Sequence, residues 1–140
     1  MLIDNILLDS LFEQAKVSER KRMNYDLRTS AEDTSQRMLN ALLPGTVVPI
    51  QHPTETVICL KGRLEEIIYE EVVEYSREET SRTEEVVRKV SFKEVSRHLI
   101  CPAEGLYGAQ IPVGAWHTIH VIEPSVIFEA KVGGYRIIEN

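Results

Sequence analysis

The stretch of sequence that decides the fold is Ile111-Pro112-Val113-Gly114-Ala115-Trp116-His117. Proline fixes the backbone φ and removes a hydrogen-bond donor, and glycine lets the chain bend into a strand without a Cβ clash. In the strand that follows, side chains alternate between two faces. We therefore predict that His117, Ile119 and Val121 share one face, whereas His120 has the opposite parity and faces solvent.

The chain on both sides of this stretch has the residue preferences of strands. β-branched residues become frequent from Thr46 onward, and strands favour such residues. We predict strands over 46–48 and 56–60, a turn at Lys61-Gly62-Arg63, and closing strands over 116–121, 125–131 and 135–138. Short strands of this kind, roughly seven or more, indicate a sandwich or a barrel.

Residues 64–95 admit two interpretations. Their many glutamates, with apolar residues spaced by fours and fives, suit a helix, whereas the frequent Val, Ile, Tyr and Thr favour strands. We predict a long hairpin with strands over 64–76 and 83–95, turning around 77–81. The charged side chains of this segment are typical of a solvated surface rather than of a site.

Two helices are predicted before the β-rich body. Residues 3–18 carry apolar side chains at near-helical spacing. Residues 33–43 form the second predicted helix, which a Pro-Gly pair ends, and a short strand over 24–30 lies between the two helices. We predict a single compact domain in which residues 1–44 form a helical extension packed on a β-barrel of residues 45–140.

The composition indicates an ordinary soluble domain. Of the 140 residues, 43% are hydrophobic and 27% charged, which is enough to bury a core without disulfides. The net charge of −6, without a Lys/Arg stripe, argues against nucleic-acid binding, and Arg20-Lys21-Arg22 is interpreted as the basic end of a helix. Cys59 and Cys101 lie in apolar runs and are predicted to be buried thiols. No apolar run suits a bilayer span or a signal peptide, so we expect a cytoplasmic protein without a membrane partner.

The chain has only four histidines, so a metal or acid–base site has few candidate residues. His52 and Glu55 lie on a loop that leads into a predicted strand, where they can meet His117 from a neighbouring strand. Two or three such side chains suit Zn, Fe, Mn or Ni and leave positions open for water or substrate. These residue types predict a divalent metal ion as cofactor.

Several blocks of the sequence resemble a known family. The run Pro112-x-Gly114-x-x-His117 resembles the second cupin motif, and the stretch from Gly45 to Gly62 resembles the first. The whole chain is similar to the WbuC-type cupin-fold metalloproteins of the RmlC-like cupin superfamily, which are found with genes of polysaccharide (O-antigen) biosynthesis. The further matching blocks are 22–28, 35–46, 55–63, 111–118 and 128–131, with Tyr135. The resemblance implies a mainly β fold, the cupin jelly-roll barrel or double-stranded β-helix.

The resemblance also implies a set of metal ligands, from which this chain departs. The family uses histidines and one glutamate, but here the loop between Gly45 and Glu55 is shorter and contains a single histidine, His52. The resemblance therefore leaves His52, Glu55 and His117 as ligands, with Gln51 a weak fourth, and implies a lowered metal affinity. The alternatives are an exposed loop histidine at His52 and a charge at a strand start for Glu55.

Contacts to a substrate are implied as well. Arg37 and Asn40 lie at i and i+3 on one face of the second predicted helix, so they can act together. The resemblance makes them candidate substrate contacts, and a hydrogen-bonded pair between helix and barrel is an equal alternative. Glu129 and Tyr135, together with Lys131, are further candidates at the mouth of the barrel.

These observations lead to two hypotheses of function. The first is a metal-binding cupin that acts on or binds a sugar or sugar-nucleotide in surface-polysaccharide metabolism, with isomerase- or epimerase-like chemistry if it is an enzyme. The second is a non-enzymatic cupin that binds a small ligand at a degenerate metal site. In both, the partner is a carbohydrate-like small molecule. A homodimer is also expected, with the N-terminal helix and the long hairpin supplying the extra surface.

Overall fold

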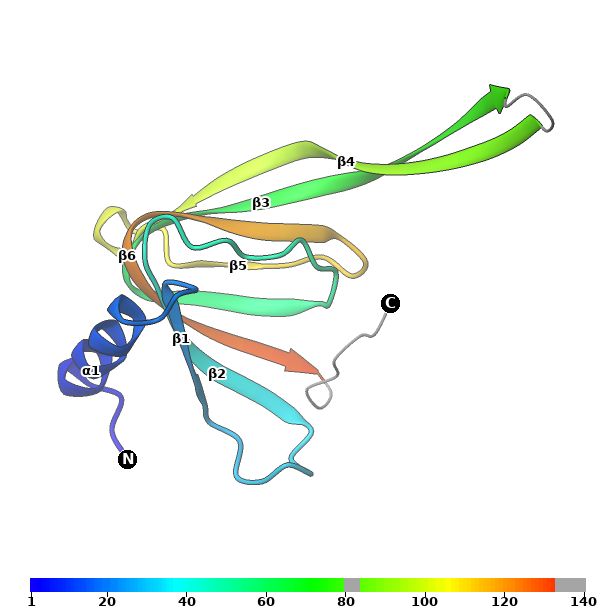
Figure 1. Ribbon diagram of the computed structural model, residues 1–140. Helices are drawn as coiled ribbons and strands as arrows, with labels where there is room; N and C mark the ends of the chain where they lie inside the picture. The colour runs from blue at the N-terminus through cyan, green and yellow to red at the C-terminus, as the bar shows by residue number, and fades with distance from the viewer. Residues whose placement is uncertain (80–83, 133–140) are drawn as a thin grey trace.

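The computed structural model describes residues 1–79 and 84–132. They form the mainly β structure expected from the sequence, built on one open antiparallel sheet with strand order β1-β2-β6-β3-β4 and with β5 beside β3 (Figure 1). The elements are α1 (Asn5–Lys16), β1 (Arg22–Asp26), β2 (Ser35–Leu42), β3 (Glu55–Glu79), β4 (Glu84–Ile100), the 3-10 helix η1 (Pro102–Glu104), β5 (Gly108–Gln110) and β6 (Trp116–Val132). The predicted strand over 135–138 lies outside the described residues.

The first predicted helix is confirmed as α1. Asp4 caps its N-terminus, because the side-chain oxygen accepts a hydrogen bond from the Leu7 backbone N–H at 3.0 Å. Leu8, Leu11 and Ala15 lie on one helical face and are buried against the outer face of the sheet. In the part of the chain that the structure describes, no helix is long and apolar enough to cross a membrane.

The second predicted helix, over 33–43, is wrong, because this segment is the strand β2. It pairs with β1 on one side and with β6 on the other. Leu39 and Ala41 pack toward α1, whereas Met38 and Leu42 face the opposite side of the sheet. Since both faces are covered, apolar residues follow one another without the alternation of a half-buried strand, and the pattern imitates a helix. The N-terminal segment therefore contributes two strands to the same sheet.

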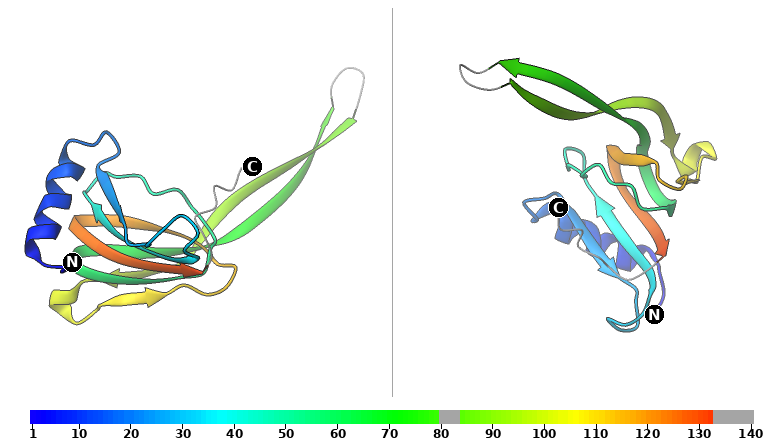
Figure 2. Two further views of the ribbon diagram at one scale, coloured as in Figure 1. Left: turned by 90° about the horizontal axis from the view of Figure 1, so that it is seen from below. Right: turned by 90° about the vertical axis from the view of Figure 1, so that its right-hand side faces the viewer.

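The sheet folds over on itself because β3 and β6 both bend (Figures 1 and 2). β3 pairs with β6 from Glu55 to Tyr69, and the register shifts repeatedly at the bend. Gly62, predicted to lie in a turn between two strands, is instead a bend inside β3 with φ +119°. Across the bend, the Arg63 backbone N–H donates to Ser125 Oγ at 3.0 Å. The predicted closing strands 116–121 and 125–131 are accordingly one bent strand.

The folded sheet encloses one apolar core, and α1 covers a second. The inner core consists of Leu42, Val57, Cys59, Leu64, Ile100, Ile119, Val121 and Ile127. The outer core consists of Leu8, Leu11, Ala15, Leu39, Ala41 and Val126. Both cysteines are buried thiols, as predicted. The inner core lies next to the bend, and the strands continue from it into the polar site described below.

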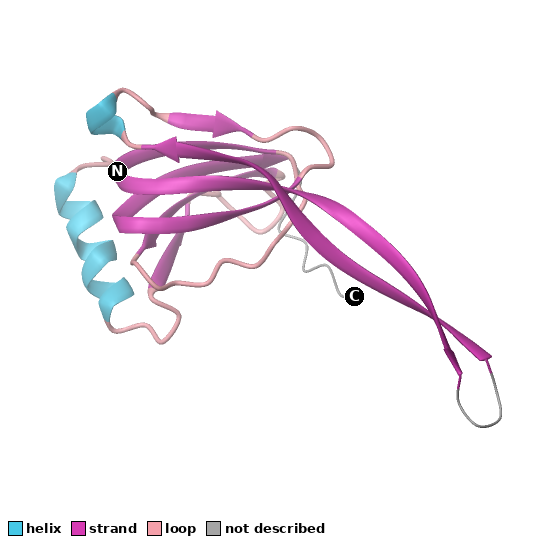
Figure 3. Cartoon of the chain, turned by 90° about the horizontal axis from the view of Figure 1, so that it is seen from above, coloured by secondary structure: helices cyan, strands magenta, loops and turns pink. Residues whose placement is uncertain are grey.

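The predicted long hairpin is confirmed, and the helix alternative for this segment is wrong. The strands β3 and β4 run further than predicted, so residues 77–79, predicted to belong to the turn, are strand. Beyond Tyr69, β3 pairs with β4 alone, and the two strands leave the body as a ribbon (Figures 1 and 3). We call the segments 70–79 and 84–93 the arm.

Candidate functional site

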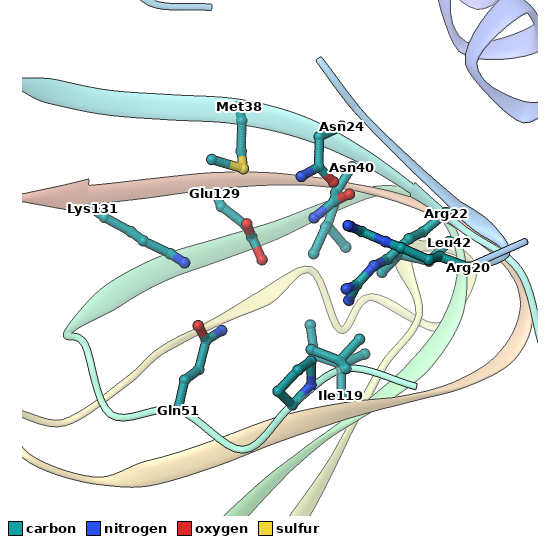
Figure 4. Close-up of a pocket in the computed structure, with 13 residues that line it drawn as sticks. Arg20, Arg22, Asn24, Met38, Asn40, Leu42, Gln51, Ile119, Glu129 and Lys131 are labelled. Carbon is teal, nitrogen blue, oxygen red and sulfur yellow. The ribbon is translucent and has the colours of Figure 1, made fainter. Parts of the chain in front are cut away.

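A pocket of about 230 Å³ lies inside the folded sheet, between β1, β2 and β6 on one side and the segment before β3 on the other (Figure 4). This volume is below the roughly 300–1,000 Å³ of pockets for drug-sized ligands, so the pocket suits a smaller molecule. It is lined by Arg20, Arg22, Asn24, Met38, Asn40, Leu42, Val48, Pro49, Gln51, Ile119, Ile127, Glu129 and Lys131.

The alternation of β6 brings one histidine inside. His117 is only 1% exposed, and Ile119 and Val121 are buried on the same face. His120 points outward, and its side chain is 58% exposed. The predicted parity of these four residues is confirmed, and it places a single imidazole in the interior from this strand.

His117 forms a buried hydrogen-bonded pair with Glu66. Its Nδ1 lies 2.6 Å from Glu66 Oε1, and its Nε2 lies 3.3 Å from the carbonyl oxygen of Pro53. Glu55 Oε1 is 3.7 Å from the same Nδ1, and both carboxyl groups are fully buried. Since the polar partners of both ring nitrogens among the described residues are oxygen acceptors, the site favours the protonated imidazole, which donates from both nitrogens.

A lysine brings a second cation into this group. Lys131 Nζ lies 2.9 Å from Glu55 Oε2, in an ion pair. Glu129, two residues earlier on β6, is buried and lines the pocket. We call Glu55, Glu66, His117, Glu129 and Lys131 the charged cluster. The two cations, His117 and Lys131, balance the negative charge of two carboxylates, so the charged cluster has one more carboxyl group than it has cations.

The protonation of the charged cluster follows from burial and from its charges. Burial raises the pKa of Glu129 to about 7, and the negative charge of Glu55 adds to this effect. Burial also raises the pKa of Glu66, against the opposing hydrogen bond with His117. For His117, burial disfavours the charged form, but the hydrogen bond to Glu66 and the nearby carboxylates outweigh it and raise the pKa. The carboxyl group of Glu129 therefore titrates near neutral pH.

The protein is expected to lose stability as the pH rises from 5 to 8, and Glu129→Gln should remove part of that loss. A carboxyl group with a higher pKa in the folded state binds more protons when folded, so folding weakens as pH rises between its two pKa values. For Glu129 these values are 4.5 and about 7. As the pH rises through this window, the free energy of unfolding of Glu129→Gln should increase relative to that of the native protein by up to about 3 kcal/mol.

Urea unfolding at a series of pH values measures this change. Glu19→Gln, at an exposed glutamate, makes the same chemical change outside the charged cluster and is the control. Glu66 and His117 also have raised pKa values, so a residual slope of the same sign should remain in Glu129→Gln. Parallel stability curves for the native protein and Glu129→Gln would show that Glu129 does not titrate in this range.

The three predicted metal ligands are only partly brought together. Glu55 and His117 meet inside the sheet, but His52 is exposed on the outer side, where its ring stacks on Trp116 with centroids 4.1 Å apart. Gln51 forms an antiparallel bridge with His117 and lines the pocket. Because consecutive residues of an extended segment point to opposite faces, placing Gln51 inside places His52 outside.

The predicted substrate contacts are separated as well. Arg37 and Asn40 lie on opposite faces of β2, so the prediction that they share one face is wrong; three positions along a strand reverse the side. Arg37 pairs with Asp33 at 3.1 Å on the side that carries α1. Asn40 lines the pocket, and its buried Oδ1 has no hydrogen-bond partner among the described residues. Glu129 lines the pocket, and Tyr135 lies outside the described residues.

The residues present do not fit the divalent metal ion that the cupin resemblance implies. Within residues 1–79 and 84–132, no three His, Cys, Asp or Glu side chains are arranged to hold a metal ion. Both ring nitrogens of His117 face protein oxygens, and the ammonium group of Lys131 already compensates Glu55. The lysine thus supplies the positive charge that a metal ion would bring to these carboxylates.

Some residues of the site were not predicted. Glu66 falls in the segment predicted to be a solvated surface, yet it is fully buried. The available signal is its position two residues after the buried Leu64, which places both side chains on one face of β3. Arg20 and Arg22, predicted to end a helix, line the pocket instead, because α1 already ends at Lys16.

The fold and the site define a class of protein: a mainly antiparallel β domain with a small polar pocket inside a folded-over sheet. Residues 3–80 match the family model described as "Domain of unknown function (DUF6016)", and the chain belongs to this family. The matched range contains α1, β1, β2 and two members of the charged cluster, Glu55 and Glu66. No curated protein matches the sequence.

Proposed function

We propose that this protein is a cupin-type domain whose pocket binds a small hydroxylated anion, such as a sugar phosphate or the sugar-phosphate part of a sugar-nucleotide, without a resident metal ion. The observation that carries the proposal is the presence, in one pocket, of arginines at one end and of amide and carboxyl groups along the rest (Figure 4). The folded-over sheet and the inward-pointing His117 support the cupin type. A role in surface-polysaccharide metabolism rests on the WbuC resemblance.

The arginine end of the pocket suits an anionic group. Arg20 and Arg22 both line it, and a guanidinium can hold a phosphate or carboxylate through two parallel hydrogen bonds. The chain as a whole carries a net charge of −6, so attraction of an anion depends on this local concentration of positive charge. The recognition of an anion is therefore assigned to this end.

The remainder of the pocket suits a hydroxylated body. Asn24, Asn40 and Gln51 present side-chain amides to it, and Ile119 and Ile127 provide apolar surface. The buried Oδ1 of Asn40 is an acceptor without a donor among the described residues, and a ligand hydroxyl would supply one. Side-chain amides together with apolar surface suit the hydroxyl and C–H groups of a sugar.

Isothermal titration calorimetry with a hexose 1-phosphate, the unphosphorylated hexose and inorganic phosphate tests the proposal. The hexose phosphate should bind most tightly, and Arg22→Gln should weaken its binding by at least about tenfold while leaving the weak binding of the hexose nearly unchanged. Arg77→Gln, at an exposed arginine on β3 of the arm, is the matched control. Absence of binding, or equal effects of the two variants, would refute it.

Two further measurements distinguish the proposed metal-free binding from a metal-dependent form of the same function. Metal analysis of protein purified without a His-tag should find no stoichiometric Zn, Fe, Mn or Ni, and a chelator should leave hexose-phosphate affinity unchanged. Stoichiometric metal together with chelator-sensitive binding would favour the metal-binding cupin instead.

An enzymatic function is favoured by one specific observation. Glu129 lines the pocket and its pKa is raised to about 7, so near neutral pH it is poised both to accept and to donate a proton. Isomerase- or epimerase-like chemistry on a bound sugar needs a group of this kind, which removes a proton from carbon and returns it without net oxidation. The test uses a hexose 6-phosphate, whose open-chain aldehyde acidifies the C–H at C2 and takes up the electron pair as an enediol when Glu129 removes the proton. Incorporation of solvent deuterium at C2, followed by NMR, tests this second function.

A further inference from the structure

The arm exposes a row of large apolar side chains on one of its faces. Directly opposite residues of paired strands share a face, and here Val73 lies opposite Val90. The exposed members of the row are Val73, Tyr75, Val86, Val90 and Phe92, with Tyr75 and Val86 about two-thirds exposed. A hairpin of only two strands is marginal in water, so the arm lacks the support that a sheet with more strands would have.

The outer edge of β4 is open to a further strand. β4 is the last strand in the sheet order and pairs only with β3 among the described residues. A long edge strand with exposed apolar residues is a template for pairing with another chain. The residues along this edge then determine which chain can pair with it.

We infer that β4 of the arm pairs antiparallel with β4 of a second copy of this chain, about a two-fold axis at Ser91. In this register Arg88 lies opposite the partner's Glu94, and Val90 lies opposite the partner's Phe92. By symmetry each pair occurs twice. Opposite charges and paired apolar side chains directly across an antiparallel ladder both stabilise it, so the edge is complementary to itself.

One like-charged pair in this register is compensated within each chain. Lys89 lies opposite the partner's Lys93, but each lysine already has a glutamate across β3, because Glu74 pairs with Lys89 and Glu70 pairs with Lys93. Glu94 also contacts Arg97 of its own chain at 2.7 Å, so the partner's Arg88 joins an existing ion pair. The carboxylate has acceptor capacity for both guanidinium groups.

Neighbouring registers fit less well. Because opposite residues of an antiparallel pair share a face, the alternative registers differ by two residues. A shift of two in one direction sets Arg88 opposite the partner's Phe92, and a shift of two in the other direction sets Val90 opposite the partner's Glu94. The free edge of β3 is a poorer candidate, because Glu70, Glu71 and Glu74 would face the same acidic segment of the partner. The β4 register at Ser91 is thus favoured by charge over the alternatives.

Pairing in this register joins two strands from each copy into one four-stranded sheet, which is large enough to be stable with an apolar face. The apolar row then continues across both arms and into each body, since the Phe92 and Trp116 rings lie 5.0 Å apart. The two pockets stay separate, because the arm leaves the body away from β1 and β2 (Figure 2).

Sedimentation velocity of the full chain at micromolar concentration tests the inference by charge reversal. Arg88→Glu and Glu94→Arg should each weaken the dimer by at least about tenfold, and the double variant should restore the native affinity, because the opposite charges meet again. Arg77→Glu makes the same charge change on β3 of the arm and is the control. A monomeric native protein, or a dimer that Arg77→Glu weakens as much as Arg88→Glu does, would overturn it.

A cysteine cross-link tests the register itself. Ser91 faces the partner's Ser91 on the axis, and directly opposite Cβ atoms lie about 4.5–5.5 Å apart, close to disulfide reach. Ser91→Cys should therefore form a disulfide-linked dimer under mild oxidation, whereas Ser76→Cys, on β3 of the same arm, should not. Equal cross-linking of the two variants, or none at Ser91→Cys in a protein that sediments as a dimer, would exclude this interface.

Discussion

Replacing His117 by alanine is expected to lower the free energy of unfolding by about 3–5 kcal/mol at pH 7, the range for removing one partner of a buried ion pair. The imidazole lies 2.6 Å from Glu66 and 3.7 Å from Glu55, and all three side chains are buried. Its loss leaves Glu66 without the cation that compensates it, whereas Glu55 keeps its ion pair with Lys131. At pH 5 the loss should be smaller, because Glu66, whose pKa is raised by burial, can then take up a proton.

A second histidine on the same strand provides the matched control. His120 pairs with Glu65 at 3.1 Å, but its side chain is 58% exposed, so His120→Ala should cost no more than about 1 kcal/mol. Urea unfolding of both variants at pH 5 and pH 7 gives the comparison. Similar losses in the two variants, or a loss in His117→Ala that does not depend on pH, would contradict the buried compensation described here.

Gly62→Ala is expected to destabilise the protein by about 3 kcal/mol or more, since backbone strain and overpacking each contribute on the order of 1–3 kcal/mol. Gly62 has φ +119°, a conformation that other residues rarely adopt. A Cβ at this position would overlap the Ser125 hydroxyl and lie 2.5 Å from the carbonyl oxygen of Pro124. Both contacts come from β6, so relief of the clash would require the two bent strands to separate.

Comparison with Gly105→Ala distinguishes the contribution of backbone strain from that of overpacking. Gly105 also has a positive φ, +77°, but a Cβ there would meet nothing within 4 Å. Its substitution should cost only the left-handed backbone strain, about 1–2 kcal/mol. Chemical unfolding of the two variants measures the difference. If Gly62→Ala is no less stable than Gly105→Ala, the close approach of β3 and β6 at the bend does not constrain this position.

The sequence was a good guide wherever burial affects only one face of an element. The opposite parities of His117 and His120 follow from alternation in a single strand, and the structure confirms them. The apolar face of α1 follows from helical spacing in the same way. The long hairpin was also predicted, because its β-branched residues outweigh a spacing that fits a helix.

The sequence misled wherever both faces of a strand are covered. β2 carries apolar residues on both sides because α1 lies on one face and the inner core on the other. The pattern then has no period of two, and local reasoning chooses a helix. The error propagated to the site, since Arg37 and Asn40 share a face on a helix but not on a strand.

For the charged cluster, too, the sequence and the tertiary structure determined different features. The alternation within β6 predicted that His117, Ile119 and Val121 share one face, and the structure places that face in the interior. Only the tertiary structure determined which side chains surround His117. Glu66 and Lys131 come from different strands, and they meet His117 and Glu55 because β3 and β6 bend together.

The sequence by itself thus determined local preferences: a β-rich body, an amphipathic N-terminal helix, a long hairpin and one inward histidine. The tertiary structure alone decided which side chains share the pocket and what compensates their charge. The physical reason is that alternation within a strand is set by the backbone, whereas the burial of Glu66, the separation of His52 from His117 and the proximity of Lys131 to Glu55 depend on how distant strands pair.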